Sequence, residues 1–155
     1  MIGSPQQPKA AVDGWFYMMV RSSPAPATVL VVEDEALVRG CAVDALSECG
    51  FHVLQAASAP AAIVLLEAAH VDAVFTDINM PGEFDGLGLV RRVRRRWPHI
   101  AIVITSGRGR PSRGVEGTHF VPKPYTPDAL APLLDEVISC RGEGGAGSKF
   151  SRLAG

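Results

Sequence analysis

Polar side chains that could do chemistry follow four short apolar runs in this sequence of 155 residues. In chain order they are Glu33 with Asp34, Asp77, Thr105 with Ser106, and Lys123. Carboxylates held close together repel one another, by up to about 4 kcal/mol for a pair about 4 Å apart at an effective dielectric constant of about 20. A cluster of Glu33, Asp34 and Asp77 therefore calls for a cation, and oxygen ligands in an exposed cleft favour magnesium, Mg²⁺.

The charges and the hydroxyl groups of this set suit a phosphoryl group. Mg²⁺ and Lys123 together balance the three carboxylates, so the site as a whole carries no formal charge. A cation, a lysine and a hydroxyl can stabilise phosphoryl oxygens through charge-assisted hydrogen bonds. Because a carboxylate can itself be the nucleophile, such a site can form an aspartyl phosphate.

The apolar runs have the pattern of strands in a parallel sheet that is covered on both faces. They are mostly β-branched and continuous rather than alternating. The runs are Val29–Val32, His52–Gln55, Ala73–Thr76, Ile100–Ile104 and His119–Val121. Because helix-like segments separate them, we predict an α/β fold with a doubly wound parallel sheet of five strands. In such a fold the site lies at the carboxyl ends of the strands, which is where the polar side chains stand.

The first predicted helix has an apolar face that stops at a glycine. The residues of this face are Val38, Ala42, Ala45 and Cys49. Gly50 follows as the residue that ends the helix, and Cys41 is also expected in the core as a small apolar residue.

Capping residues mark the starts of the later helices. Ser58, Asp85 and Thr126 each precede a helix-like segment and can accept hydrogen bonds from its first N–H groups. Between the fourth and fifth strands, Gly107–Gly117 holds four glycines and a proline, which disfavour a helix. We therefore expect the connection there to be short or irregular.

The length and composition fit one compact domain with loose ends. Hydrophobic residues make up 47% of the chain and charged residues 20%, with a net charge of -1. These values exclude a wholly disordered chain and give no electrostatic case for nucleic-acid binding. We predict a flexible N-terminal extension at residues 1–27, a domain at 28–140 and a flexible tail at 141–155. Because no run approaches the ~20 apolar residues of a membrane span and no secretory signal is recognisable, we expect a cytoplasmic protein.

The strongest charge feature is the run Arg91–Arg96, in which five of the six residues are arginines. It ends a predicted helix, where cations suit the helix dipole. We interpret the run as a solvated helix face, with binding of a partner as the alternative. Because no recognition helix or interleaved aromatic residues accompany it, we expect no contact with nucleic acid.

Four motifs, taken together, resemble the receiver domain of two-component response regulators. They are Val29–Glu35 (VLVVEDE), Phe75–Gly82 (FTDINMPG), Ile104–Gly107 (ITSG) and Val121–Tyr125 (VPKPY). The resemblance covers about residues 28–140 and implies a flavodoxin-like, three-layer sandwich with strand order 2-1-3-4-5. Because few residues follow position 140, we expect a stand-alone, single-domain regulator that is a monomer or a weak homodimer.

The resemblance implies roles for the acidic residues. Asp77 would accept a phosphoryl group from a histidine kinase or a histidine phosphotransfer protein. Glu33, Asp34 and Asp77 would hold Mg²⁺ directly or through water, and the main-chain carbonyl of Asn79 would add a ligand. The output would be phosphorylation-dependent contact with an unknown protein target, or onward phosphorelay.

The resemblance also implies how phosphorylation would be sensed. The hydroxyl of Thr105 would move toward the phosphoryl oxygen, and Lys123 would pair with that oxygen. The Lys123–Pro124 bond is expected to be cis. Phe120 stands three residues before the lysine, where the family keeps a switch aromatic, although plain core packing explains this residue nearly as well. Rearrangement of Thr105 and Phe120 would then alter the surface of the fourth strand, the last strand and the last helix.

Three other functions fit parts of the pattern. A Mg²⁺-dependent phosphatase or phosphotransferase also forms an aspartyl phosphate, but such enzymes usually carry an acid where this chain has Asn79. A nucleotide or flavin binder of the same architecture needs a glycine loop after the first strand, and Glu33–Ala36 offers none. A degenerate receiver that acts without phosphorylation would not need the complete set of acids, hydroxyl and lysine.

Overall fold

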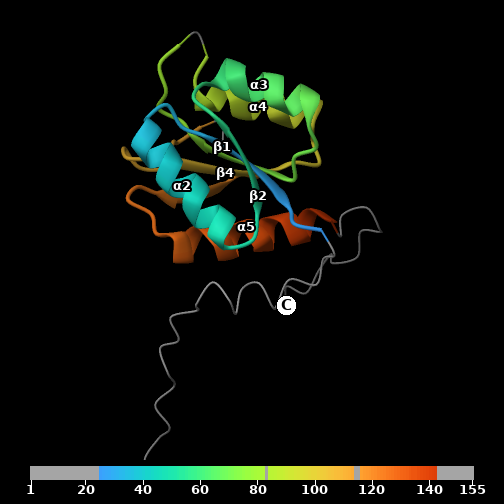
Figure 1. Ribbon diagram of the computed structural model, residues 1–155. Helices are drawn as coiled ribbons and strands as arrows, with labels where there is room; N and C mark the ends of the chain where they lie inside the picture. The colour runs from blue at the N-terminus through green and yellow to red at the C-terminus, as the bar shows by residue number, and fades with distance from the viewer. Residues whose placement is uncertain (1–24, 83, 114–115, 143–155) are drawn as a thin grey trace, which may run out of the picture.

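The computed structural model describes residues 25–82, 84–113 and 116–142, which form five strands and four helices (Figure 1). The strands are β1 (Thr28–Val32), β2 (His52–Ala56), β3 (Ala73–Asp77), β4 (Ala101–Ser106) and β5 (His119–Pro122). The helices are α2 (Ala36–Glu48), α3 (Ala59–Ala68), α4 (Gly86–Arg96) and α5 (Pro127–Gly142). The predicted extensions at residues 1–27 and 141–155 fall almost entirely outside the described residues.

The sheet confirms the predicted fold class. All five strands are parallel, and they are hydrogen-bonded in the order β2-β1-β3-β4-β5. Val32 of β1 pairs with Thr76 of β3, and Asp77 of β3 pairs with Thr105 of β4. The carboxyl ends of the three central strands therefore meet at one edge of the sheet.

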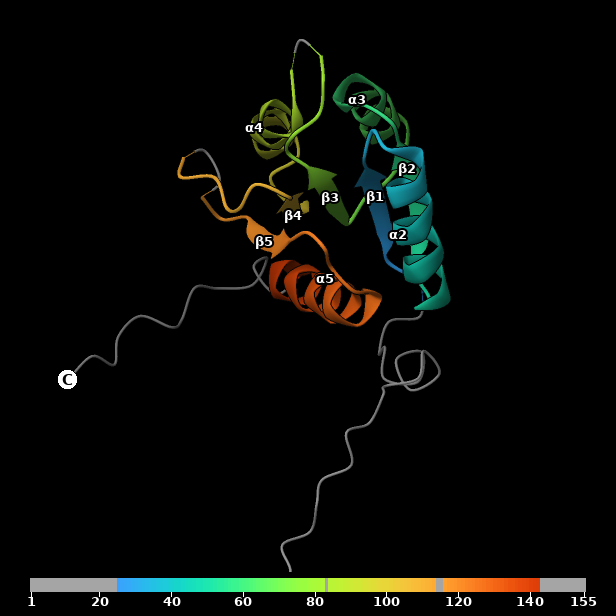
Figure 2. The same cartoon turned by 90° about the vertical axis from the view of Figure 1, so that its left-hand side faces the viewer.

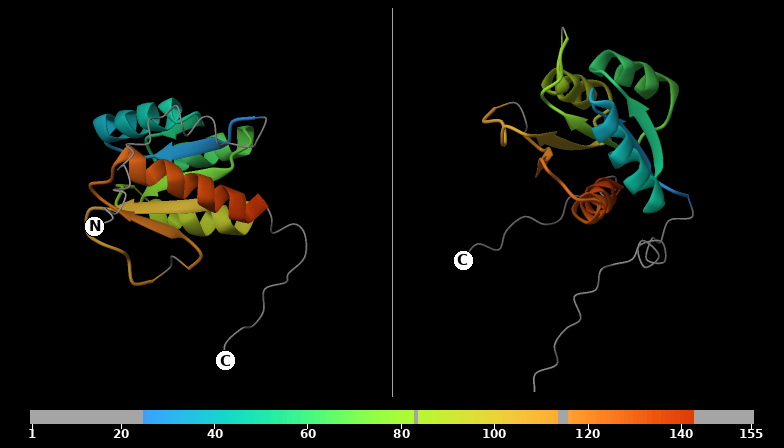
Figure 3. Two further views of the ribbon diagram at one scale, coloured as in Figure 1. Left: turned by 90° about the horizontal axis from the view of Figure 1, so that it is seen from below. Right: turned by 60° about the vertical axis from the view of Figure 1, so that its left-hand side comes forward.

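Helices cover both faces of the sheet and make three layers. Helices α3 and α4 lie on one face, and α2 and α5 lie on the other (Figures 2 and 3). Because successive strand residues point to opposite faces, Val74 and Ile102 pack toward α3 and α4, whereas Phe75 and Val103 pack toward α2 and α5. The central strands are buried on both sides, which explains why their sequences are continuously apolar.

Helix α2 differs in detail from the predicted apolar face. Ala42 and Leu46 are its buried residues, while Ala45 is only half-buried. Cys41 is exposed, so the prediction that it lies in the core is wrong. It stands one residue before Ala42, on the part of the helix that turns away from the sheet. Gly50 follows the helix with a φ of 86°, the left-handed conformation expected of a glycine that ends a helix.

The predicted helix starts are confirmed for α3, α4 and α5. The Ser58 hydroxyl accepts a hydrogen bond from the N–H of Ala61, and Asp85 accepts two from the first turn of α4. Helix α5 begins at Pro127, directly after Thr126. No helix in the described part of the chain is both long enough and apolar enough to cross a membrane.

The connection between β4 and β5 is irregular, as its glycines predict. Residues 107–113 and 116–118 contain no helix. Gly117 has a φ of 67° and lies against the guanidinium of Arg94, which reaches over from α4. This contact brings Gly117, near the end of the irregular connection, against α4.

Candidate functional site

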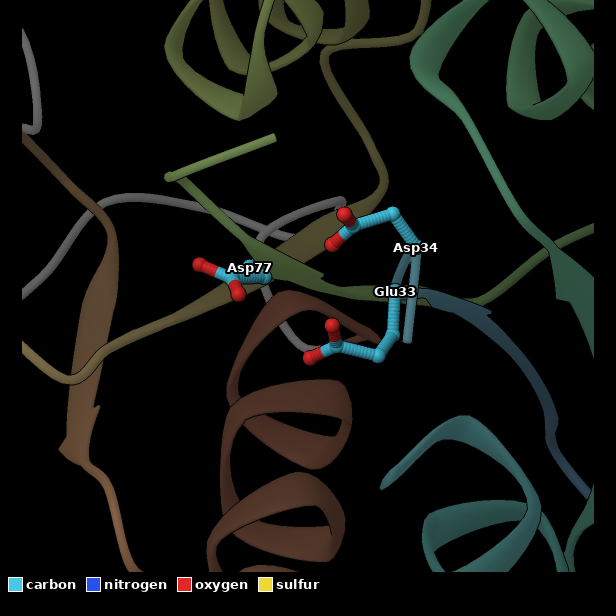
Figure 4. Close-up of side chains that lie close together, drawn as sticks. All are labelled: Glu33, Asp34 and Asp77. Carbon is cyan, nitrogen blue, oxygen red and sulfur yellow. The ribbon is translucent and has the colours of Figure 1, made fainter. Parts of the chain in front are cut away.

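Three carboxylates converge at the carboxyl edge of the sheet. Glu33 and Asp34 follow β1, and Asp77 ends β3 beside them (Figure 4). One oxygen from each of the three side chains lies within 4.8 Å of the others. Glu33 and Asp77 are buried, whereas Asp34 is exposed. The structure therefore brings together the three acids that the sequence placed at the strand ends.

Lys123 makes ion pairs with two of these acids. Its Nζ donates to Oδ2 of Asp77 at 2.7 Å and to Oε2 of Glu33 at 2.8 Å. Burial by itself would lower the pKa of Lys123, but the hydrogen bonds to Asp77 and Glu33 outweigh it and raise the pKa. The lysine therefore stays charged at neutral pH. The peptide bond from Lys123 to Pro124 is cis, as expected.

Glu33 is the acid most affected by its surroundings. Burial raises its pKa above 4.5, although the hydrogen bonds from Lys123 and from the backbone N–H of Glu35 act in the opposite direction. The N–H of Glu35 lies 3.2 Å from Oε1 of Glu33. Carboxylates crowded in this way gain from any further positive charge nearby.

Two adjacent hydroxyls at the end of β4 have different surroundings. Thr105 is paired with Asp77 across the sheet and is buried, and its Oγ1 has no hydrogen-bond partner in the part of the chain that the structure describes. Ser106 is also buried, but its Oγ accepts from Nδ2 of Asn79 at 2.7 Å and from the N–H of Arg108 at 3.0 Å. Thr105 thus offers an unused hydroxyl beside Asp77, while Ser106 ties two loops together.

The backbone around Asp77 is held tightly. The N–H of Asn79 donates to Oδ1 of Asp77 at 2.8 Å. Gly86, the first residue of α4, lies against the carbonyl of Asp77, and a Cβ at this position would stand 2.6 Å from Cα of Ile78. The first turn of α4 therefore packs directly on the backbone at the end of β3.

Two further residues near the site were assigned no role in the sequence analysis. Arg39 on α2 donates to the carbonyl of Glu33 at 2.8 Å, which fixes the end of β1. The ring of Tyr125 packs edge-on against Phe75 at 5.1 Å, and burial raises its pKa to about 12. The aromatic residue after Lys123–Pro124 could have been noticed, but Arg39 becomes visible only once the elements are packed.

Phe120 does not lie in the site itself. It is half-buried in β5 and packs on the core that faces α3 and α4. Its strand partner is Ile104, whereas Thr105 pairs with Val121. Any coupling between Phe120 and Thr105 must therefore pass through neighbouring residues of β4 and β5.

The site has the chemistry of a magnesium site. The clustered donors are three carboxylates, which suit Mg²⁺, with no histidine or cysteine among them. The exposed position of Asp34 leaves room for the water ligands that Mg²⁺ keeps. The unpartnered Thr105 hydroxyl is available to a further oxygen group at the same edge.

A parallel sheet of this strand order, with acids, hydroxyl and lysine at its carboxyl edge, defines a CheY-like member of the flavodoxin fold class. A family model for the response regulator receiver domain matches residues 29–135. The chain therefore belongs to the receiver domain family of two-component response regulators. Receiver domains are signalling domains that accept a phosphoryl group and interact with histidine kinases or phosphotransfer proteins.

Relatives of known name support this membership. The chain is 38% identical over 121 residues to sensor kinase CckA of Brucella abortus, covering 72% of this chain and 12% of that protein. It is 33% identical over 112 residues to a putative NtrX-like response regulator of Rickettsia felis, covering 68% of this chain and 24% of the relative. It is 30% identical over 121 residues to protein PetR of Rhodobacter capsulatus, covering 75% of this chain and 50% of PetR. The chain thus spans only 12% to 50% of the length of these relatives.

Solved structures give the same result. A response regulator receiver protein from Sinorhizobium medicae aligns with a TM-score of 0.71 at 30% identity, covering 77% of this chain and 99% of that one. Chemotaxis protein CheY4 of Vibrio cholerae aligns with a TM-score of 0.67 at 28% identity, covering 73% of this chain and 99% of the CheY4 chain. These two solved chains are matched along almost their whole length.

Proposed function

We propose that Asp77 accepts a phosphoryl group from a phosphohistidine on a histidine kinase or a histidine phosphotransfer protein. The observation that carries this proposal is the convergence on one buried carboxylate of a lysine, two further acids and an unused hydroxyl. Lys123 lies 2.7 Å from Asp77, and Thr105 lies opposite it in the strand register. This set is complete for binding and stabilising a transferred phosphoryl group.

In the transfer, a carboxylate oxygen of Asp77 attacks the phosphorus of the donor. The P–N bond breaks as a P–O bond forms, and the electron pair returns to the imidazole nitrogen, which takes up a proton. Lys123 stabilises the charge on the phosphoryl oxygens, and the Thr105 hydroxyl donates to one of them. Burial of Asp77 limits the access of other nucleophiles to the acyl phosphate.

We propose that Glu33, Asp34 and Asp77, together with the main-chain carbonyl of Asn79, hold Mg²⁺. When bound, this ion neutralises charge on the carboxylates and on the phosphoryl oxygens. Glu33 and Asp77 already share Lys123, so the lysine and the ion divide the compensation of their charge. The proposal is supported by the 4.8 Å cluster of oxygens.

We further propose that the phosphorylated state is sensed by Thr105 and Phe120. Phosphorylation adds about -1.5 to -2 charges beside the unpartnered hydroxyl, which gives Thr105 an acceptor that it otherwise lacks. A shift of Thr105 then acts on β5, its neighbour in the sheet, and on the half-buried ring of Phe120. The surface of β4, β5 and α5 would change for a protein partner.

Several features of this proposal are carried forward from the sequence. We propose a receiver domain at residues 28–140, signalling in the cytoplasm by protein contact or phosphorelay, as a monomer or a weak homodimer. Action as a single-domain regulator stays a prediction. Catalysis on an external substrate is disfavoured because Asn79 donates its amide to Ser106 where a phosphatase of this type would have an acid.

The test is phosphorylation by acetyl phosphate with Mg²⁺, followed by intact-protein mass spectrometry. Wild-type protein should gain one phosphoryl group, and Asp77→Asn should gain none. Asp44→Asn, which removes an exposed acid on α2, is the matched control and should behave as wild type. Beryllofluoride should shift the spectra of wild type and of Asp44→Asn only. Equal labelling of Asp77→Asn and wild type would show that the acceptor is another residue.

A further inference from the structure

The arginines of this chain are concentrated in one stretch. Eight of the eleven lysines and arginines in the described residues lie between Arg91 and Arg113, and this stretch contains no Asp or Glu. The whole chain nevertheless has a net charge of -1. The positive charge is therefore gathered in one part of the molecule rather than spread over the surface.

The fold brings two separate groups of these arginines together. On α4, Leu89, Val90 and Val93 point to the core, so at about 100° per residue Arg91 and Arg95 lie on the outer side of the helix. Arg94 lies on the flank of α4, where its guanidinium contacts Gly117. The connection between β4 and β5, which contains Arg108, Arg110 and Arg113, runs on the side of α4 that faces away from α3 (Figure 2). Gly117 near the end of this connection meets Arg94.

We name the resulting surface the arginine face. It consists of the exposed residues Arg91, Arg95, Arg108, Arg110 and Arg113. Arg94 lies half-buried beneath them, with Nε and Nη2 of its guanidinium buried. None of these six arginines has an acidic side chain within ion-pair distance among the described residues, whereas Arg96 on the α3 side of the same helix pairs with Glu67 at 2.7 Å.

We propose that the arginine face is a docking surface for an acidic segment of a partner protein. Guanidinium groups present planar pairs of N–H donors that match the two oxygens of a carboxylate. Arg96 at the end of α4 already binds one carboxylate oxygen, with Nη1 donating to Oε1 of Glu67 on α3 at 2.7 Å. The surface contains none of the residues proposed to accept the phosphoryl group or to hold Mg²⁺, although the N–H of Arg108 donates to Ser106 at the edge of the acid site. Docking of an acidic segment can therefore be measured on the unphosphorylated protein.

Nucleic acid and membranes fit this surface less well. Single-stranded nucleic acid needs aromatic faces for base stacking, but Arg92 covers Phe84 at 5.3 Å and Arg96 covers Trp97 at 4.5 Å. A membrane surface needs apolar side chains that insert among the cations. Among the described residues, the large apolar side chains that are exposed, Leu37 and Val64, lie on α2 and α3 instead.

The experiment measures binding of a fluorescent oligoglutamate peptide by anisotropy at an ionic strength of about 0.15 M. Arg91→Gln with Arg95→Gln should weaken binding about tenfold, and neutralising Arg108, Arg110 and Arg113 should do the same. The matched control is Val64→Glu with Ala68→Glu, which changes the net charge equally on exposed positions of α3 and should weaken binding less than about twofold. Replacing Arg91 and Arg95 by lysine should give an intermediate affinity, because charge is kept and the planar fork is lost.

Three results would overturn the proposal. They are no binding of the wild type at this ionic strength, an equal loss in the control pair, or tighter binding of a labelled oligonucleotide or of phosphatidylserine vesicles than of the peptide. Circular dichroism melting shows that each variant is folded. Because the arginine variants keep Asp77 and Lys123, they should still be phosphorylated by acetyl phosphate, so failure of docking and failure of phosphorylation are distinguished on the same samples.

Discussion

The carboxyl edge of the sheet and the arginine face handle charge in opposite ways. At the sheet edge, Glu33 and Asp77 are buried, and Lys123 compensates both through short ion pairs. On the arginine face, five like charges stay in water without acidic partners among the described residues. Because the sheet edge is buried, the stability of the fold should depend strongly on changes of charge or volume there. Because the arginine face is screened by solvent, substitutions on it should change stability little.

The largest expected difference concerns two glycines, one in each region. Gly86→Ala should destabilise the fold by about 3 kcal/mol, because the added Cβ would collide with the backbone of Asp77 and Ile78. Gly109→Ala has open space around it and a φ of 86°, so it should cost only about 1 kcal/mol of backbone strain. Urea unfolding measures both. Equal losses of unfolding free energy would show that the start of α4 can move away from the end of β3.

The next expected effect is that of removing a single cation. Lys123→Met should lower the unfolding free energy by about 2 kcal/mol without Mg²⁺, because Glu33 and Asp77 lose their shared partner. Arg95→Met, on the arginine face, should change it by less than about 0.5 kcal/mol.

The stability comparison of Lys123→Met with wild type can be repeated with magnesium present. If the three acids hold Mg²⁺, adding it should restore more stability to Lys123→Met than to wild type, because the ion replaces part of the missing charge. Thermal melting with and without Mg²⁺ measures the difference. No preferential rescue would argue against a cation site shared with the lysine.

A smaller effect on stability is expected from removing each of the two hydroxyls at the end of β4. Thr105→Val should leave stability within about 0.5 kcal/mol of wild type, since the hydroxyl that it removes has no partner among the described residues. Ser106→Ala should cost about 1–2 kcal/mol, because Asn79 and Arg108 lose their acceptor. Chemical denaturation measures the unfolding free energies of both variants. A larger loss for Thr105→Val than for Ser106→Ala would reverse the assignment.

The smallest expected effect is on pH dependence. Burial raises the pKa of Glu33 above 4.5, so the folded protein holds this proton more tightly than the unfolded chain. The stability that this provides is complete below about pH 4.5 and is lost as the pH rises through the raised pKa. In Mg²⁺-free buffer, Glu33→Gln should therefore lose less stability than wild type as the pH rises above about 4.5.

The matched control for this measurement is Glu48→Gln, which removes an exposed acid of α2. It should keep the wild-type dependence of unfolding free energy on pH. Identical slopes for wild type and Glu33→Gln would contradict a raised pKa at Glu33.

Much of the fold follows from local patterns. The strands are continuous and β-branched because both faces of the sheet are covered, and Ser58 and Asp85 cap helices through contacts within one turn. The site could be predicted for a related reason. Parallel strands bring their carboxyl ends to one edge, so Asp77 and Lys123 meet although 46 positions separate them.

Features that depend on packing between distant elements could not be predicted. Leu46 rather than Ala45 is buried because the sheet fixes the rotation of α2, which the apolar spacing leaves open. The contact of Arg94 with Gly117 joins α4 to an irregular segment and has no local signature. The partner of Arg39, a backbone carbonyl, is likewise invisible in the sequence.

The contact of Gly86 with the Asp77 carbonyl couples the position of α4 to the backbone at the end of β3. The helix begins against the end of β3 and ends in arginines, so a rotation about its first turn would move its last turn. Eleven residues of helix span about 16 Å. A tilt of about 5° about the first turn would carry the last turn about 1.4 Å across the surface, by the same helical rise. A small backbone movement at Asp77 would thus displace the charged arginines in the last turn of α4.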